Sequence, residues 1–143
     1  MAEFIDFAFR HWYLFVALFV ILGALVGGEI LRKMRGITAL NPTQALQLIN
    51  HQDAVVVDVR DSADFKTGHL PNAHHIPVGE LKQRLKELNK FKEKPIILYC
   101  RTDTRAGSAG AQLKKEGFSM VSTLQGGIAA WQNASLPLSK SKK

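Results

Sequence analysis

The sequence predicts an α/β fold, in which a parallel sheet carries helices on both faces and one transmembrane helix precedes it. Residues 54–59 and 95–100 are short β-branched or aliphatic runs, typical of buried strands. Segments with helical spacing of apolar residues separate such runs, which indicates parallel strand connections. Residues 12–28 contain no charge, and the same helical pattern extends to residue 31.

Length and composition are those of one globular domain with an N-terminal extension. The chain has 143 residues, of which 46% are hydrophobic and 22% charged, and its formal net charge is +7. This positive excess favours anionic partners such as lipid headgroups or small anions. We expect no nucleic-acid partner, because the chain has no arginine-rich helix and no basic strand with interleaved aromatic residues. The single cysteine excludes an internal disulfide.

The apolar segment at residues 12–31 has the length of a transmembrane helix. Twenty residues at about 1.5 Å each span roughly 30 Å, the thickness of the hydrocarbon core of a bilayer. Trp12 and Tyr13 stand where an interfacial aromatic belt is expected. Basic residues are more frequent after the segment than before it: Arg10 precedes it, and Arg32, Lys33 and Arg35 follow. The positive-inside rule therefore places the N-terminus outside and residues 36–143 in the cytoplasm.

The same segment leaves two further questions open. A cleaved signal peptide would need a basic n-region and a shorter apolar core, although the sequence VGG at residues 26–28 resembles a cleavage site. Gly23 and Gly27 form a G-x-x-x-G pattern that lets two helices approach closely, so a homodimer through this face is an alternative to a monomer. The predicted organisation is a short N-terminal segment (1–11), a transmembrane helix (12–31), a basic linker (32–36), a domain (37–138) and a basic tail (139–143).

Strands and helices alternate along the predicted domain. Asn41 is a favourable N-cap residue and Pro42 suits the first helical position, so a helix is expected to begin there. Residues 68–77 are rich in turn residues and are expected to form a loop. The remaining expected elements are strands at 54–59, 95–100 and 119–124 and helices at 79–91, 105–118 and 126–133.

The only cysteine, Cys100, ends a predicted strand and precedes a polar loop. In parallel α/β sheets, ligands bind at the carboxyl ends of the strands. The amides and dipole at the start of the next helix, together with Arg101 and Arg105, would place positive potential at the thiol. Such a field favours the thiolate, which is the nucleophilic form of cysteine. The alternatives are an inert buried cysteine that packs as a small hydrophobic residue and a cysteine that forms an intermolecular bridge.

Three stretches resemble the motifs of a single rhodanese domain. VVVDVR with DFKTGHLPNAHHIP resembles D-x-R followed by G-H-I-P-G-A-x-N-I-P, ILYCRTDTRA resembles the active-site C-R-x-G-x-R, and VSTLQGGIAAW resembles the closing L-x-G-G-x-x-x-W. The resemblance covers residues 37–138, the whole predicted domain. A transmembrane helix ahead of one such domain is similar to the small membrane-anchored rhodanese-like proteins of bacteria, which implies an inner-membrane location.

The resemblance implies a sulfurtransferase that moves sulfane sulfur from a donor such as thiosulfate or a persulfide to an acceptor such as cyanide or a thiol. Cys100 would carry the sulfur as a persulfide, without a cofactor. The cradle of that anion would be the loop Arg101, Thr102, Asp103, Thr104 and Arg105, whose two arginines would contact the donor. Asp58 and Arg60 would brace the site, and His69 and Trp131 are expected to be structural.

The loop agrees with the family in length and departs from it at one position. Four residues separate Cys100 from Arg105, whereas rhodanese-fold phosphatases have five, so the loop favours sulfur over phosphate. Asp103 replaces the usual loop glycine. Aspartate tolerates the left-handed backbone region, but its charge opposes the two arginines. We therefore expect modest activity with thiosulfate or a preference for a persulfide donor.

The sequence also has features that bear on functions other than sulfur transfer. His69, His74 and His75 are candidate metal ligands, but no second cysteine or nearby acidic cluster completes a site, so no metal is expected. The fold could also serve as an adaptor or scaffold of a membrane protein complex, with little or no turnover. The retained cysteine with both arginines argues against a pure scaffold. Charges of both signs between residues 80 and 94 predict a solvated face rather than a docking face for a membrane or partner.

Overall fold

The computed structural model describes residues 1–34, 36–102 and 104–140, without the side chains of residues 32–34 and 104. It divides into two compact units, Met1–Met34 and Arg35–Lys143. The first unit holds α1 (Ala2–Arg10), which has no counterpart among the predicted elements, and α2 (Trp12–Met34). Within α2, Trp12–Leu31 is long and apolar enough to cross a membrane; a signal sequence would satisfy the same criteria.

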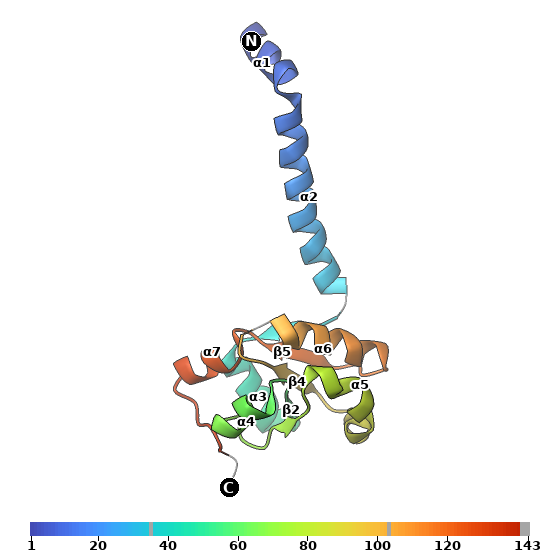
Figure 1. The fold of residues 1–143 in the computed structure, drawn as a ribbon, viewed down its shortest axis with the longest axis vertical. Helices are drawn as coiled ribbons and strands as arrows, with labels where there is room; N and C mark the ends of the chain where they lie inside the picture. The colour runs from blue at the N-terminus through green and yellow to red at the C-terminus, as the bar shows by residue number, and fades with distance from the viewer. Residues whose placement is uncertain (35, 103, 141–143) are drawn as a thin grey trace. The chain divides into compact units, whose positions relative to one another are not determined.

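In the described part of the second unit, five parallel strands form one sheet in the order β1-β5-β4-β2-β3 (Figure 1). The strands are β1 (Thr38–Leu40), β2 (Val55–Asp58), β3 (His74–His75), β4 (Ile96–Tyr99) and β5 (Val121–Leu124). Asp58 at the end of β2 lies beside Tyr99 at the end of β4, so the carboxyl ends of these neighbouring strands meet at one edge. The predicted α/β fold class is confirmed.

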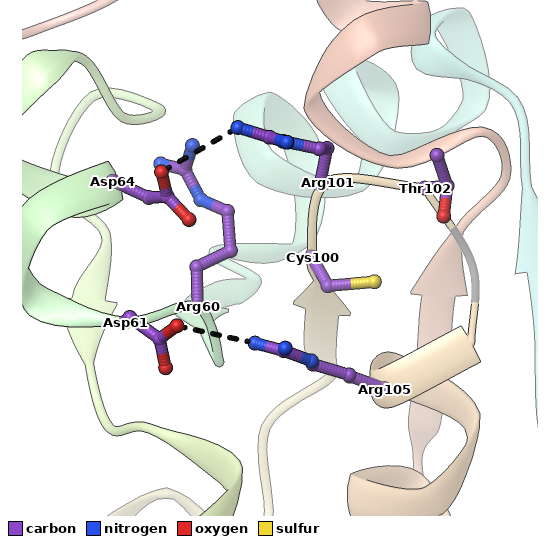
Figure 2. Close-up of a pocket in the computed structure, with 7 residues that line it drawn as sticks. All are labelled: Arg60, Asp61, Asp64, Cys100, Arg101, Thr102 and Arg105. Carbon is purple, nitrogen blue, oxygen red and sulfur yellow. Dashed lines mark ion pairs between the residues drawn. The ribbon is translucent and has the colours of Figure 1, made fainter.

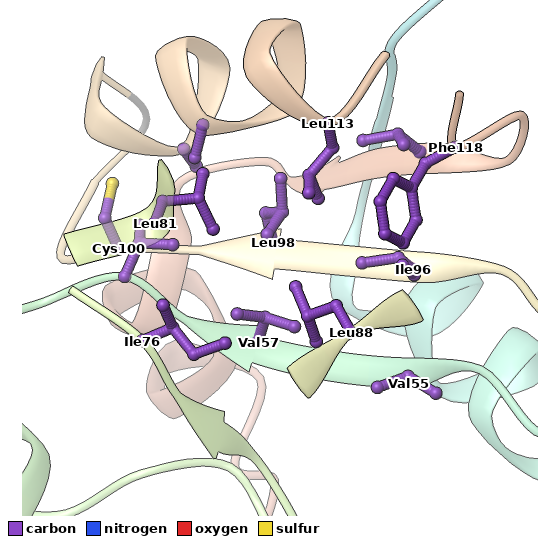
Figure 3. Close-up of a cluster of buried hydrophobic side chains, with 14 residues drawn as sticks. Val55, Val57, Ile76, Leu81, Leu88, Ile96, Leu98, Cys100, Leu113 and Phe118 are labelled. Carbon is purple, nitrogen blue, oxygen red and sulfur yellow. The ribbon is translucent and has the colours of Figure 1, made fainter. Parts of the chain in front are cut away.

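Helices cover both faces of the sheet (Figure 1). On one face, α5 (Leu81–Arg84) and α6 (Thr104–Lys115) pack on every second strand residue; Figure 3 shows Val57, Leu98 and Leu113 in this cluster. On the other face, α3 (Pro42–Gln52) and α7 (Gly127–Asn133) cover Val56 and Ile97. This alternation follows from the two-residue period of a strand. It decides which face each functional side chain occupies.

The start of α3 and the end of α6 follow from local signals. Gln44 N–H donates to Asn41 Oδ1 at 2.8 Å, and Asn41 N–H donates to Gln44 Oε1 at 3.0 Å, which completes a capping box ahead of α3. Gly117 has a φ of +91°, a conformation suited to glycine, just after α6 ends. The predicted start of α3 is confirmed, whereas α6 ends at Lys115, three residues before the predicted end at residue 118.

The helix predicted over residues 79–91 is wrong in its length. Only α5 is α-helical there, and 3₁₀ turns η1 (Val78–Glu80), η2 (Leu85–Glu87) and η3 (Asn89–Phe91) make up the rest. The apolar residues that pack into the core are spaced by four, three and three: Leu81, Leu85, Leu88 and Phe91. A spacing of three matches the three residues per turn of a 3₁₀ helix, so the chain buries these side chains by tightening its turns.

Short elements account for the other differences. β1, β3 and α4 (Ser62–Thr67) were not predicted, and β3 lies inside the expected loop 68–77. Their two to six residues are too few for a periodic pattern. Ser139 and His69 exchange backbone hydrogen bonds of 2.9 and 2.8 Å, so the first residue of the predicted tail pairs with the domain.

Candidate active site

Cys100 lies at the carboxyl edge of the sheet, directly after β4 rather than within it. Because side chains alternate along a strand, Cys100 points to the same face as Leu98, the face that α6 covers (Figure 3). Its side chain is 3% exposed and forms the end of a buried apolar cluster. It also lines a cavity.

The cavity beside Cys100 has a volume of about 370 Å³. Figure 2 shows its lining residues: Arg60, Asp61, Asp64, Cys100, Arg101, Thr102 and Arg105. Three of them follow β2, and four belong to the segment that runs from the end of β4 into α6. Neighbouring parallel strands therefore supply the two halves of the site, as expected at the carboxyl edge of such a sheet.

Arg101 and Arg105 line the cavity, and each faces a carboxylate across it (Figure 2). Arg101 Nη2 lies 3.6 Å from Asp64 Oδ1, and Arg105 Nη1 lies 3.5 Å from Asp61 Oδ2. All four side chains are more than a third exposed. Neither aspartate was predicted to belong to the site, although a spacing of three residues at the start of a short helix places two side chains on the same face.

The rest of the predicted cradle is only partly described. Thr102 lines the cavity, and Thr104 begins α6 with its side chain outside the described residues. Asp103 lies outside the described residues altogether. The predictions for these two side chains remain predictions.

Gly127 supports the loop from α7. Its φ is +60°, and a Cβ atom there would clash with the carbonyl oxygens of both Cys100 and Thr102. The neighbouring Ile128 N–H donates to the Cys100 carbonyl at 3.0 Å. Only glycine allows this close approach, so the second glycine of the closing G-G-x-x-x-W motif helps to fix the backbone around Cys100.

Asp58 and Arg60 form a buried ion pair, with Arg60 Nη2 2.7 Å from Asp58 Oδ2. Along β2, Asp58 points to the same face of the sheet as Val56. Its carboxylate therefore lies on the opposite face from Cys100. The hydroxyl of Tyr99 donates to Asp58 at 2.7 Å and accepts from the Leu70 N–H at 3.1 Å. Arg60 Nη2 also donates to the Gly68 carbonyl at 2.6 Å. These bonds tie the ends of β2 and β4 to the segment after α4.

The protonation of this network follows from its surroundings. Burial lowers the pKa of Arg60, but the hydrogen bonds and charge of Asp58 outweigh it, so the pKa is raised overall. Burial, with the charge of Asp58, raises the pKa of Tyr99 far above its ordinary value. Arg60 therefore stays charged and Tyr99 stays protonated at physiological pH. Tyr99 was not predicted to belong here, although a buried tyrosine generally needs a partner for its hydroxyl.

Two of the loop histidines contact Phe65, and the third, His74, contacts Phe91. His69 and His75 stack on the Phe65 ring with centroid distances of 3.9 and 4.5 Å. The Nδ1–H of His69 donates to the Phe65 carbonyl, and the Nε2–H of His75 donates to the Arg60 carbonyl. His69 is buried, as is Trp131 in the core, which agrees with the structural roles expected for both. Within residues 1–34, 36–102 and 104–140, no group of three or more His, Cys, Asp or Glu side chains could hold a metal ion.

Comparisons with known proteins match the same part of the chain. The sequence model of the family described as "Rhodanese-like domain" matches residues 41–134. The uncharacterized protein YibN of Escherichia coli K12 is 32% identical over 143 residues, covering 99% of this chain and all of that protein. The thiosulfate sulfurtransferase GlpE of Coxiella burnetii is 32% identical over 89 residues, covering 62% of this chain and 81% of that protein. The crystal structure of a rhodanese-related protein from Thermoplasma volcanium has a TM-score of 0.65 at 25% identity and covers 73% of this chain and 99% of that one.

Proposed function

Because this chain belongs to the rhodanese-like domain family, we propose that it is a sulfurtransferase that carries sulfane sulfur as a persulfide on Cys100. The position of Cys100 carries the proposal: it lies at the carboxyl end of β4 and lines a cavity together with Arg101 and Arg105. The relative named as a thiosulfate sulfurtransferase supports the same chemistry.

In the proposed reaction, the Cys100 thiolate attacks the terminal sulfur of the donor. The sulfur–sulfur bond of the donor breaks, and its electron pair leaves with sulfite when the donor is thiosulfate. The persulfide then passes its outer sulfur to cyanide or a thiol, which restores the thiolate. Arg101 and Arg105 would bind the anionic donor, while the backbone from Arg101 to Arg105 and the start of α6 would stabilise the persulfide. The charge of Asp103 would oppose the binding of thiosulfate.

Intact mass measurement tests this function directly. After incubation with thiosulfate or a persulfide donor, the full chain should gain about 32 Da, the mass of one sulfur atom, and Cys100→Ser should not. The rate of Cys100 alkylation as a function of pH reports when the thiolate forms. A chain that gains no sulfur from either donor, and whose alkylation follows that of an ordinary thiol, would contradict the proposal.

A second candidate is an adaptor with little or no turnover. Two observations favour it: Cys100 is 3% exposed, and Arg101 and Arg105 already face carboxylates. An adaptor would need a partner in the membrane but no persulfide. Recovery of a specific membrane protein with both the wild-type chain and Cys100→Ser, in the absence of any sulfur adduct, would favour the adaptor.

We also propose that α2 anchors the protein in the bacterial inner membrane, with the N-terminus outside and the domain in the cytoplasm. The apolar length of Trp12–Leu31 supports a span, and the basic residues after it support the orientation. The mass of the isolated protein would reveal cleavage of a signal peptide. In a Cys100→Ser background, a cysteine placed in the tail should react with an impermeant thiol reagent only after the membrane is opened.

The proposed homodimer contact is the face of α2 that carries Gly23 and Gly27. Gly27→Leu should reduce crosslinking between copies if this face is the contact, because bulky side chains prevent close helix approach. Leu25→Ile is the control for a change elsewhere on the helix. Equal crosslinking in all three chains would exclude this contact.

A further inference from the structure

We propose that Asp61 and Asp64 determine donor specificity, because they disfavour dianionic sulfur donors and so favour donors with a single negative charge. This inference rests on the proposed function of Cys100 and names the class of donor that the site accepts best. It concerns two side chains that line the cavity and that no motif of the sequence pointed to.

The two carboxylates line the cavity that would receive the donor. Asp61 is the N-cap residue of α4 and Asp64 lies in its first turn, so both project from the same end of a short helix. Each faces one of the arginines proposed to hold the donor, at 3.5 Å for Arg105 and 3.6 Å for Arg101. Figure 2 shows these pairs on the two sides of the cavity that Cys100 also lines. An anionic donor therefore competes with the carboxylates for the same guanidinium groups.

The charges of the described lining nearly cancel. Arg60 contributes a positive charge, but the buried Asp58 neutralises it at 2.7 Å. Arg101 and Arg105 then remain as the positive charges available to a ligand, and the two aspartates of α4 offset them one for one. A cavity with such a balance attracts a dianion much less than its two arginines alone would.

The ion pairs Arg101–Asp64 and Arg105–Asp61 are weak enough for a ligand to displace the carboxylates. Their separations exceed the usual 2.7–3.2 Å of a hydrogen bond. All four side chains are partly or largely exposed, so water screens them, and exposed pairs of this kind contribute little to stability. The arginines can therefore turn toward a donor at small cost. What the carboxylates still impose is repulsion, and its free energy grows in proportion to the charge of the donor.

Two donors of different charge test this dependence. Thiosulfate carries two negative charges and the methanethiosulfonate anion carries one, and each has a terminal sulfur bonded to a second sulfur. In both cases the Cys100 thiolate takes the terminal sulfur, and the electron pair of the broken bond leaves with sulfite or with methanesulfinate. With cyanide as acceptor, thiocyanate formation gives kcat/KM for each donor with the full-length protein in detergent.

The double variant Asp61→Asn/Asp64→Asn should raise kcat/KM for thiosulfate roughly five- to tenfold and for methanethiosulfonate roughly two- to threefold. The ratio of the two should therefore rise about threefold, and added salt should reduce the change. The ratio is the decisive quantity, because any effect of the variant on the Cys100 thiolate is common to both donors and cancels. Asparagine is also a good N-cap residue, so α4 should persist, and each single variant should show a smaller change in the same direction.

The matched control removes two negative charges elsewhere. Asp53 precedes β2 and Glu93 precedes β4. Both therefore lie near the amino-terminal ends of these strands, whereas Cys100 lies at the carboxyl end of β4. The variant Asp53→Asn/Glu93→Gln should leave the donor ratio unchanged.

The possible outcomes distinguish a failure of this specificity role from a failure of the proposed sulfurtransferase function. A normal sulfur adduct with an unchanged donor ratio in the Asp61/Asp64 variant would overturn the specificity role alone. Equal losses with both donors would also overturn it, since they would show that the carboxylates hold the arginines in place. A wild-type chain that takes no sulfur from either donor would overturn the proposed function itself, and the inference with it.

Discussion

Arginine and aspartate are paired in two regions near the carboxyl ends of the strands, one buried and the other partly exposed. In the first region, Asp58 and Arg60 are 0% and 6% exposed and lie 2.7 Å apart, with Tyr99 as a third partner. In the second, Arg101 with Asp64 and Arg105 with Asp61 line the cavity, 3.6 and 3.5 Å apart, and their side chains are 36–77% exposed. The first region joins segments of backbone, and the second surrounds a space that a ligand can enter.

The difference shows that burial, rather than residue type, decides what such a pair does. A buried ion must keep its partners, because an unpaired charge in the interior is very unfavourable. An exposed pair exchanges its partner for water at almost no cost, so its members remain free to meet a ligand. The following variants test this comparison in order of decreasing expected effect, and the control for the first variant is described directly after it.

Asp58→Asn should have the largest effect on stability. The variant keeps the shape of the side chain but leaves the buried guanidinium of Arg60 without its counter-charge. We expect the free energy of unfolding to fall by about 3–5 kcal/mol, measured by chemical denaturation of the full-length protein in detergent.

Asp53→Asn is the matched control for this variant. Asp53 pairs with Lys94 at 2.6 Å, no farther apart than the buried pair, but the two side chains are 84% and 43% exposed. Its loss should cost less than about 1 kcal/mol. Similar losses in the two variants would show that distance, and not burial, governs these pairs.

Tyr99→Phe should have an intermediate effect. The variant removes the hydroxyl that donates to Asp58 and accepts from the Leu70 N–H, and it leaves that N–H buried without this partner. Three hydrogen bonds from the Arg60 side chain still reach Asp58. We expect a loss of about 1–3 kcal/mol at pH 7, seen in the same denaturation experiment.

The Tyr99 variant also makes a prediction about pH. Because the pKa of Tyr99 is raised in the folded protein, its contribution to stability is fully present below the ordinary tyrosine value of about 10. Above that pH the unfolded chain loses the proton while the folded chain keeps it, so the contribution falls by about 1.4 kcal/mol per pH unit. The stability difference between wild type and Tyr99→Phe should therefore shrink between pH 9 and 11. A difference that stays constant over this range would mean that the hydroxyl is not held as described.

The sequence was sufficient for the parts of the fold that depend on local patterns. Short apolar or β-branched runs predict β2, β4 and β5, and the N-cap residue Asn41 with Pro42 predicts the start of α3. The position of Cys100 at the edge of the sheet followed from the strand that precedes it and the helix that follows. These features need only the residues within one element or at its boundary.

The missed features depend on contacts between distant segments. Asp61 and Asp64 matter because α4 comes opposite the loop after β4, which no pattern within α4 reveals. Tyr99 belongs to the bracing network because Leu70 and Asp58 meet its hydroxyl, 29 and 41 residues away in sequence. The turns at residues 78–91 show the same limit, since the core decides there whether leucines spaced by three or four continue an α-helix.

Asp64→Asn should have the smallest effect on stability and so gives the sharpest contrast with Asp58→Asn. Both replace an aspartate that faces an arginine near Cys100, but the Asp64 pair is separated by 3.6 Å and its arginine is 77% exposed. After allowance for solvent screening, we expect the free energy of unfolding to change by less than about 0.5 kcal/mol. A loss of several kcal/mol would mean that Asp64 braces the fold as Asp58 does. In that case the cavity mouth would be a structural contact, and its arginines would not be free to bind a donor.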